Sequence, residues 1–159
     1  MSDNTVLDQN DSVHEAIEAL SKLLVMMRLS TYIMAVYAMI QGILVIIGGP
    51  DRFSALGYRT AMIVPGAPAS WGWVLLAFGI ISFVGIKNRM YRVGYLGMFG
   101  AGTWSFCFGG AFLISAVQYP EANLTAVATY GKDGVIFVLM AMAQWTLSHA
   151  HTKPEDYNA

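Results

Sequence analysis

Charged side chains are scarce in this sequence of 159 residues. Lysine, arginine, aspartate and glutamate together make up 12% of it, whereas hydrophobic residues make up 56%. A typical soluble domain carries charge on about a quarter of its residues, so this chain has too little charge to cover a globular surface. Intrinsic disorder over most of the chain is also excluded, because disordered segments contain few apolar residues. The composition predicts an integral membrane protein that lies in a lipid bilayer.

Cysteine and clusters of basic residues are nearly absent as well. The single cysteine, Cys107, excludes a scaffold held by internal disulfides, and we expect it to be a small buried apolar residue. Nine Lys and Arg balance ten Asp and Glu, and no run of basic residues stands out. Nucleic-acid binding is therefore not expected, because it needs a basic surface.

Four stretches without Asp, Glu, Lys or Arg are long enough to cross a bilayer. They contain 22, 27, 28 and 19 residues, and a helix needs about 20 to cross the hydrocarbon core. A soluble bundle would show a polar stripe along each helix, yet Ser82 is the only polar side chain within 74–86. We predict an all-α integral membrane fold, a four-transmembrane-helix bundle at 29–150, with spans near 30–48, 71–87, 94–117 and 134–150.

Turn-forming residues and tryptophans set the ends of these predicted spans. The Gly-Gly-Pro sequence at 48–50 ends the first span, because proline cannot continue a helix. The Pro-Gly-Ala-Pro sequence at 65–68 interrupts the second window, so its helix is expected to begin near Trp71. Trp71 and Trp73 are predicted to be interface anchors, since amphipathic rings favour the headgroup level.

The distribution of basic residues predicts the orientation in the membrane. With four spans, both termini lie on the same side as the loop between the second and third spans. That side holds six of the nine Lys and Arg, and the cluster Lys87, Arg89 and Arg92 supplies half of them. The positive-inside rule then predicts that the N and C termini are cytoplasmic.

A different kind of segment precedes the first span. We predict a disordered N-terminus at 1–11 and an amphipathic cytoplasmic or interfacial helix at 12–28. Ser12 and Glu15 fit a capping box at the start of this helix, and apolar residues follow at helical spacing. Two roles are open for it: shielding the cytoplasmic ends of the bundle, or packing against a second copy. At the other end of the chain, 151–159 is predicted to be a polar tail.

Small residues at four-residue intervals predict a helix-packing face. Such residues let two helix backbones approach closely inside a bilayer. The spacing leaves open whether the partner helix belongs to the same chain or to another copy in a homo-oligomer. The members of this predicted face are Gly97, Ala101, Ser105 and Gly109 in the third span and Ala38 and Gly42 in the first.

Polar side chains inside the predicted spans are few, and none is charged. Gln41, Thr103 and Gln144 are the candidates for interhelical hydrogen bonds or for a wet crevice. A proton- or cation-coupled carrier would lack its relay, because no carboxylate or base lies within a predicted span. Histidines lie only at or beyond the cytoplasmic ends, so neither a metal site nor a haem site is expected. The sequence predicts no cofactor and no enzyme activity.

The first outer loop and the turn that follows carry a recognisable pattern. Gly-Pro-Asp-Arg-Phe at 49–53 is followed by Pro-Gly-Ala-Pro at 65–68, by Ser-Trp-Gly at 70–72 and by a short basic hairpin. This pattern resembles small four-span proteins of actinobacteria and their phages, which in phages are often encoded beside the endolysin and described as holin-like. The resemblance implies a phage protein in the bacterial host's cytoplasmic membrane that accumulates, oligomerises and helps release or activate the lysis enzyme. Many holins end in a strongly basic tail, from which the mixed-charge tail of this chain departs.

Three functions are compatible with these features. The first is a holin-like protein that self-associates and forms membrane lesions, for which toxic expression with loss of membrane potential is the distinguishing observation. The second is a non-lytic partner of another membrane protein, such as a superinfection-exclusion factor or an accessory subunit, for which harmless expression and a co-purifying partner are expected. The third is a pore for a small neutral solute, lined by Gln41, Thr103 and Gln144.

Overall fold

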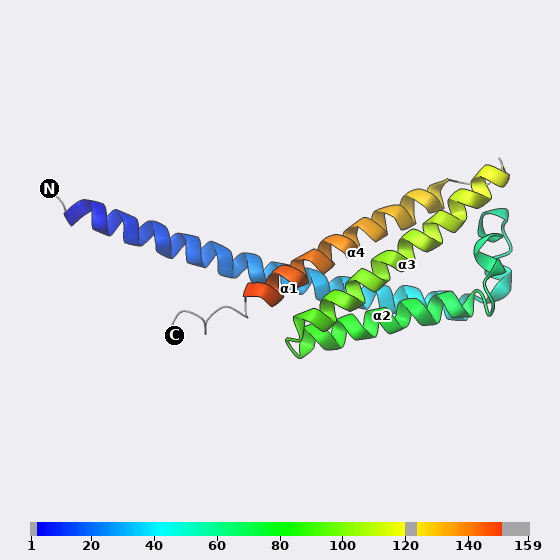
Figure 1. Ribbon diagram of the computed structural model, residues 1–159, viewed down its shortest axis with the longest axis horizontal. Coiled ribbons are helices and arrows are strands. Elements are labelled where there is room, and N and C mark those ends of the chain that lie inside the picture. The colour runs from blue at the N-terminus through cyan, green and yellow to red at the C-terminus, as the bar shows by residue number, and fades with distance from the viewer. Residues whose placement is uncertain (1–2, 120–123, 151–159) are drawn as a thin grey trace.

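The computed structural model describes residues 3–119 and 124–150, and most of them are helical. In these ranges the chain contains no strand, so the all-α prediction is confirmed for them. Helix α2 packs against both α1 and α3, and α3 also packs against α4 (Figure 1). The elements in chain order are α1 (Asp3–Arg52), the short 3-10 helices η1 (Leu56–Tyr58) and η2 (Ala61–Ile63), α2 (Ala69–Lys87), α3 (Tyr91–Gln118) and α4 (Thr125–Ala150).

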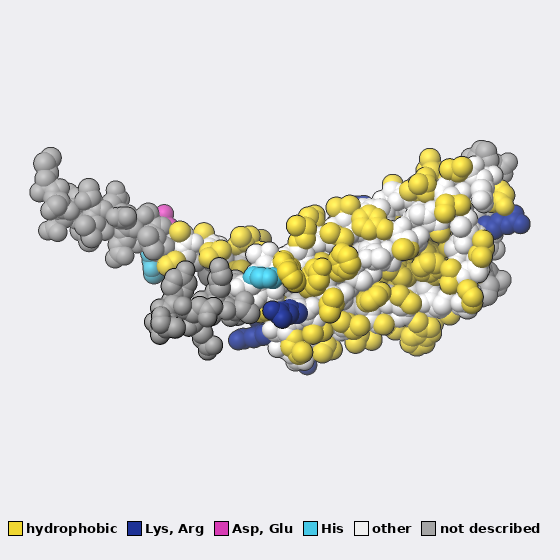
Figure 2. Space-filling model, in the orientation of Figure 1, with side chains coloured by type: hydrophobic (Ala, Val, Ile, Leu, Met, Phe, Trp, Pro, Cys, Tyr) yellow, Lys and Arg dark blue, Asp and Glu magenta, His cyan; other side chains and the backbone are white. Residues whose placement is uncertain are grey.

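Four helices are long and apolar enough to cross a membrane, as the sequence predicted. Helices α2 and α3 match the predicted spans 71–87 and 94–117 to within three residues at each end. Hydrophobic side chains cover most of the visible face of the bundle, and Lys and Arg gather toward its two ends (Figure 2). In water such a surface would be unfavourable, whereas in lipid it is the surface expected. The arrangement is that of a multi-pass membrane protein.

Helix α1 begins earlier than predicted and ends close to where it was predicted to end. Gly49 has φ of 65° and ψ of 174°, which breaks the helical geometry at a residue type that tolerates positive φ. At the other end the segment predicted to be disordered is helical from Asp3 onward, and residues 1–2 lie outside the described ranges. Ser12 is therefore inside the helix and is not its N-cap. The helix extends this far because no glycine or proline interrupts residues 3–41.

The N-terminal part of α1 projects beyond the bundle (Figure 1). Every side chain from His14 to Met26 is exposed. This part consequently does not cover the ends of the other helices, which is contrary to the shielding role expected for it. Folding back onto the bundle would need a break in the helix, and α1 has helical geometry up to Gly49.

Helix α4 begins at Thr125, well before the predicted start at residue 134. The start of this helix was predicted too far along the chain because the apolar window excluded Lys132 and Asp133. The residues before them are compatible with a helix, and Gly134 lies within it against α3. A Cβ at Gly134 would stand 2.9 Å from the ring of Phe106, so glycine here lets the two helices approach. The predicted polar tail at 151–159 lies outside the described residues.

Candidate functional site

The predicted packing face of α3 contacts other helices of the same chain. A Cβ on Gly97 would stand 2.6 Å from the backbone nitrogen of Ser82 in α2, and one on Gly109 would stand 3.3 Å from the Cβ of Tyr130 in α4. Ala101 and Ser105, which lie between these two glycines on the packing face, are each about 1% exposed. This face holds α3 to its two neighbours within one copy and leaves no room for a helix from a second copy.

The shorter face of α1 is also used within the chain. Ala38 is fully buried, and a Cβ on Gly42 would stand 2.7 Å from the backbone nitrogen of Leu76 in α2. On the other side of the same contact, a Cβ on Gly72 would stand 2.9 Å from the backbone nitrogen of Ile46. The two glycines therefore set a close approach of the α1 and α2 backbones.

The two tryptophans predicted to be interface anchors have different environments. Trp71 turns inward, where its indole N–H donates a hydrogen bond of 2.8 Å to the carbonyl oxygen of Ala61 in η2 and its ring lies edge-on to Trp104. It thereby ties the outer loop to the bundle. Trp73 is 60% exposed on the apolar outer surface, so it alone has the free ring that an anchor requires.

The three predicted polar residues lie in three separate places. Thr103 is on the outside of α3, where its hydroxyl donates to the carbonyl oxygen of Phe99 at 3.0 Å. The neighbouring Cys107 is exposed too, contrary to the expectation that it is buried. Gln144 is fully buried at the contact between α4 and α1, and Gln41 lines a different cavity. They share no pathway, so the structure gives no support to a pore lined by these residues.

Gln144 links α4 to α1 near the end of the bundle where α2 ends and α3 begins. Its amide nitrogen donates a hydrogen bond of 3.1 Å to the hydroxyl of Thr31, and that hydroxyl donates to the carbonyl oxygen of Met27 at 2.8 Å. The amide oxygen of Gln144 has no hydrogen-bond partner and lies close to Gly94 of α3. The link therefore depends on the hydroxyl of Thr31.

Replacing Thr31 by valine should weaken this link at nearly constant side-chain volume. We expect the free energy of unfolding in detergent to fall by about 1 kcal/mol, since hydrogen bonds between membrane helices are worth about 0.6 kcal/mol on average and up to about 1.7. Chemical denaturation followed by tryptophan fluorescence measures this loss. The control is Thr103→Val on the exposed side of α3, where we expect a change below about 0.5 kcal/mol. Equal losses in the two variants would contradict the assignment.

A second polar link joins α1 to α4 at a carboxylate that the sequence analysis placed outside the membrane. Asp133 lies within α4 and is only 7% exposed. The hydroxyl of Tyr37 in α1 donates a hydrogen bond of 2.8 Å to Oδ2 of Asp133. The ammonium nitrogen of Lys132 is 3.7 Å from Oδ1, and the Lys132 side chain is 67% exposed. The prediction that no span contains a carboxylate was therefore wrong for the fourth apolar helix.

A small cavity adjoins this carboxylate. Its polar lining comes from Tyr37 and Gln41 of α1, Ser105 of α3 and Asp133 of α4. The cavity measures about 10 Å³, which is close to the space that one water molecule needs. The polar lining would give that water hydrogen-bond partners inside an otherwise apolar core.

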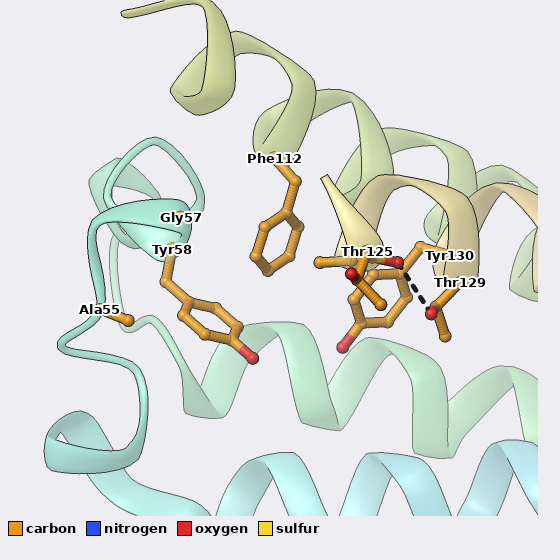
Figure 3. Close-up of a pocket in the computed structure, with 8 residues that line it drawn as sticks. Ala55, Gly57, Tyr58, Phe112, Thr125, Thr129 and Tyr130 are labelled. Atoms are coloured by element: carbon orange, nitrogen blue, oxygen red, sulfur yellow. Dashed lines mark hydrogen bonds between the residues drawn. The ribbon is translucent and has the colours of Figure 1, made fainter. Parts of the chain in front are cut away.

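An open cleft lies between the loop that contains η1 and the start of α4 (Figure 3). It measures about 390 Å³ and is mostly lined by aromatic rings and threonines. Tyr58 of η1 and Tyr130 of α4 lie on the two sides of Phe112, edge-to-face with it at 4.7 Å and stacked on it at 5.5 Å. Tyr130 lines both this cleft and the small cavity, so the two adjoin at this side chain.

No known protein family, curated protein or solved structure matches this chain. Among residues 3–119 and 124–150, no three His, Cys, Asp or Glu side chains lie close enough together to hold a metal ion.

The sequence does contain a signal for the buried carboxylate. Tyr37 lies in the middle of the first span, and a buried tyrosine hydroxyl normally has a hydrogen-bond partner. Asp133 stands beside Lys132 and between Gly131 and Gly134, a sequence typical of a polar loop, and the predicted fourth span begins after it. What the sequence alone does not reveal is that a helix continues through these glycines.

Proposed function

We propose that this chain is a holin-like protein of the bacterial cytoplasmic membrane, with both termini in the cytoplasm, that permeabilises the membrane after several copies assemble. Three features support it: the resemblance of the loop pattern to that of small four-span phage proteins, the excess of Lys and Arg on one side, and the four long apolar helices. Such a function has two requirements. A single copy must be closed, and it must have a surface through which copies associate.

A single copy is packed as a closed core. The side chains of Met98, Phe108 and Phe137 at its centre are at most 1% exposed, and Trp104 is 5% exposed. The cavity beside them measures about 10 Å³ and holds at most about one water. Permeation of ions or proteins would therefore require an assembly of several copies.

The observation that carries the proposal is an exposed apolar ridge on α1, formed by Ile17, Leu20 and Leu24. These side chains are 59%, 56% and 36% exposed. Their spacing of three and four residues puts them on one face of the helix. This spacing is that of a coiled-coil seam, in which the side chains of one helix fit between those of an identical helix. The α1 ridge is therefore suited to a second copy of the same chain.

Charge next to the α1 ridge also favours a second copy over a partner of opposite charge. Lys22 and Glu18 form an ion pair at 2.7 Å on the same helix, so this part of α1 has little net charge with which to repel its own copy. All copies insert into the membrane in the same orientation, which lets their α1 helices run in parallel. The small-residue face of α3 is already used within the chain, so the α1 ridge is the association surface that we assign.

Controlled expression in a bacterial host tests the proposal. Membrane potential is followed with a voltage-sensitive dye and viability by colony counts, while cross-linking in membranes reports the oligomer. The wild-type chain should depolarise the membrane and stop growth. Leu20→Lys should prevent both effects and reduce the cross-linked oligomer, because an ammonium group cannot be buried unpaired in an apolar seam.

The matched control is Ala19→Lys, which adds the same charge one residue away and off the α1 ridge. It should depolarise the membrane like the wild type. Normal potential at high expression of the wild-type chain would refute the lytic function. If expression is harmless and another membrane protein co-purifies with the wild type but not with Leu20→Lys, the ridge serves a non-lytic partner instead.

A further inference from the structure

The buried carboxylate of Asp133 lies well inside the helical bundle. It is about two turns beyond the start of α4 at Thr125, and its side chain contacts α1 through Tyr37. An ionised group at such a depth in a membrane protein is costly, so carboxylates there are rare and commonly mark a proton or ion pathway. The proposed formation of membrane lesions does not involve Asp133, so this carboxylate can have a separate role.

The groups around Asp133 are suited to a carboxylate whose charge changes. Tyr37 of α1 donates to it at 2.8 Å, and Lys132 of α4 is the one cation found close to it among the described residues, at 3.7 Å. Tyr130 of α4 lines the same cavity. The rest of the lining has no ionisable group: Leu75 from α2, and Trp104 and Ser105 from α3.

The open cleft and the small cavity beside Asp133 adjoin at Tyr130, which lines both. The cavity beside Asp133 has the size of a single water, which is enough to relay a proton by hydrogen bonds. The cavity is too small to hold a hard metal cation together with the six or more oxygen ligands that such a cation takes. Lys132 would also repel a metal cation.

We propose that Asp133 is a proton-binding site within the bundle, supplied with protons from the outer face through the cleft and past Tyr130. The ligand is a proton, carried by water, and it neutralises the carboxylate that Tyr37 contacts. A hydrogen bond to a neutral carboxyl is weaker than one to a carboxylate, so proton binding loosens the contact between α1 and α4.

Labelling with dicyclohexylcarbodiimide tests this site in intact cells that express the full chain. This apolar reagent reacts with protonated carboxyl groups. The carboxyl oxygen bonds to the central carbon of the reagent, the carboxyl proton moves to its nitrogen, and the adduct rearranges without loss of atoms to an N-acylurea that mass spectrometry locates. Asp133 should be labelled several-fold more when the external pH is lowered from about 8 to about 5 with the internal pH held constant, because the reagent reacts with the protonated carboxyl.

Two variants distinguish a proton-binding role of Asp133 from a purely structural role. Asp133→Asn should lose the label. Tyr37→Phe keeps the carboxyl but removes the hydroxyl that contacts it, so the reagent should reach the carboxyl more readily and the yield at a given external pH should rise. The matched control Tyr95→Phe removes a hydroxyl from a side chain of α3 that lines neither the cleft nor the small cavity, and it should leave the yield unchanged.

Three results would overturn the proposal. The first is absence of label on Asp133 at every pH in both the wild type and Tyr37→Phe. The second is a yield that follows the internal pH alone, which would place the access route on the opposite side. The third is protection by sodium at constant pH, which would identify a metal cation as the ligand. None of these outcomes depends on whether the chain depolarises the membrane.

Discussion

Replacing Gly97 by leucine is expected to destabilise the bundle severely. Even the first atom of the new side chain would stand 2.6 Å from the backbone nitrogen of Ser82 and 2.8 Å from the carbonyl oxygen of Phe78. Both atoms belong to the backbone of α2, so no side-chain rotation relieves the contact and the two helices must separate. Overpacked cores lose about 1–3 kcal/mol and occasionally more. We expect a loss at the upper end of this range or failure to fold.

The control for this prediction is Gly110→Leu on the same helix. No atom lies within 4 Å of a Cβ built at Gly110, and leucine favours a helix more than glycine does. The midpoint of thermal unfolding in detergent should therefore stay within a few degrees of the wild type for Gly110→Leu and fall well below it for Gly97→Leu. Similar midpoints for the two variants would show that α3 does not pack against α2 through Gly97.

Replacing Phe108 by alanine should produce the second large effect. The ring of Phe108 is 1% exposed and lies 4.9 Å from the ring of Trp104, 5.1 Å from that of Trp71 and 4.9 Å from that of Tyr130. Its removal leaves a void where dispersion contacts on all sides are lost. We expect the free energy of unfolding to fall by about 3–5 kcal/mol, which is typical for a buried phenylalanine.

The comparison variant is Phe99→Ala, between two and three turns away on the same helix. Phe99 is 47% exposed, so its removal should cost about 1 kcal/mol or less. Equilibrium unfolding in detergent and near-ultraviolet circular dichroism, which reports the packing of Trp71 and Trp104, measure both variants. If Phe108→Ala keeps the wild-type spectrum and stability, the aromatic cluster does not hold the outer half of the bundle together.

The sequence was sufficient to predict where α2 and α3 lie. Their ends coincide with signals that act locally: Pro-Gly-Ala-Pro at 65–68 before α2, and the basic cluster from Lys87 to Arg92 between them. The apolar content of these helices was equally informative, because crossing a bilayer requires about 20 apolar residues whatever the helix packs against. Small residues predicted close packing of α3, and the structure identifies the partner helices as α2 and α4.

The buried carboxylate depends on tertiary contacts, which the sequence did not reveal. Asp133 is costly inside a bundle unless a donor such as Tyr37 satisfies it, and these residues lie far apart in the chain. A window without charged residues treats every aspartate as exposed, so the fourth window begins at Gly134 and excludes the carboxylate. The N-terminal extension of α1 was missed for a related reason: polarity was taken as disorder, although no residue of 3–41 is a strong helix breaker.

Because α1 is long and projects beyond the bundle, a small change in its direction moves its N-terminal end a long way. Its hydrogen bond to α4 at Thr31 lies near the point where α1 leaves the bundle, and roughly 40 Å of helix separate that residue from Asp3 at about 1.5 Å per residue. A bend of about 10° near Thr31 would displace the far end sideways by roughly 7 Å over such a length. A change at this point that leaves the contacts of α1 within the bundle intact would therefore appear as a large movement of the N-terminal end of α1.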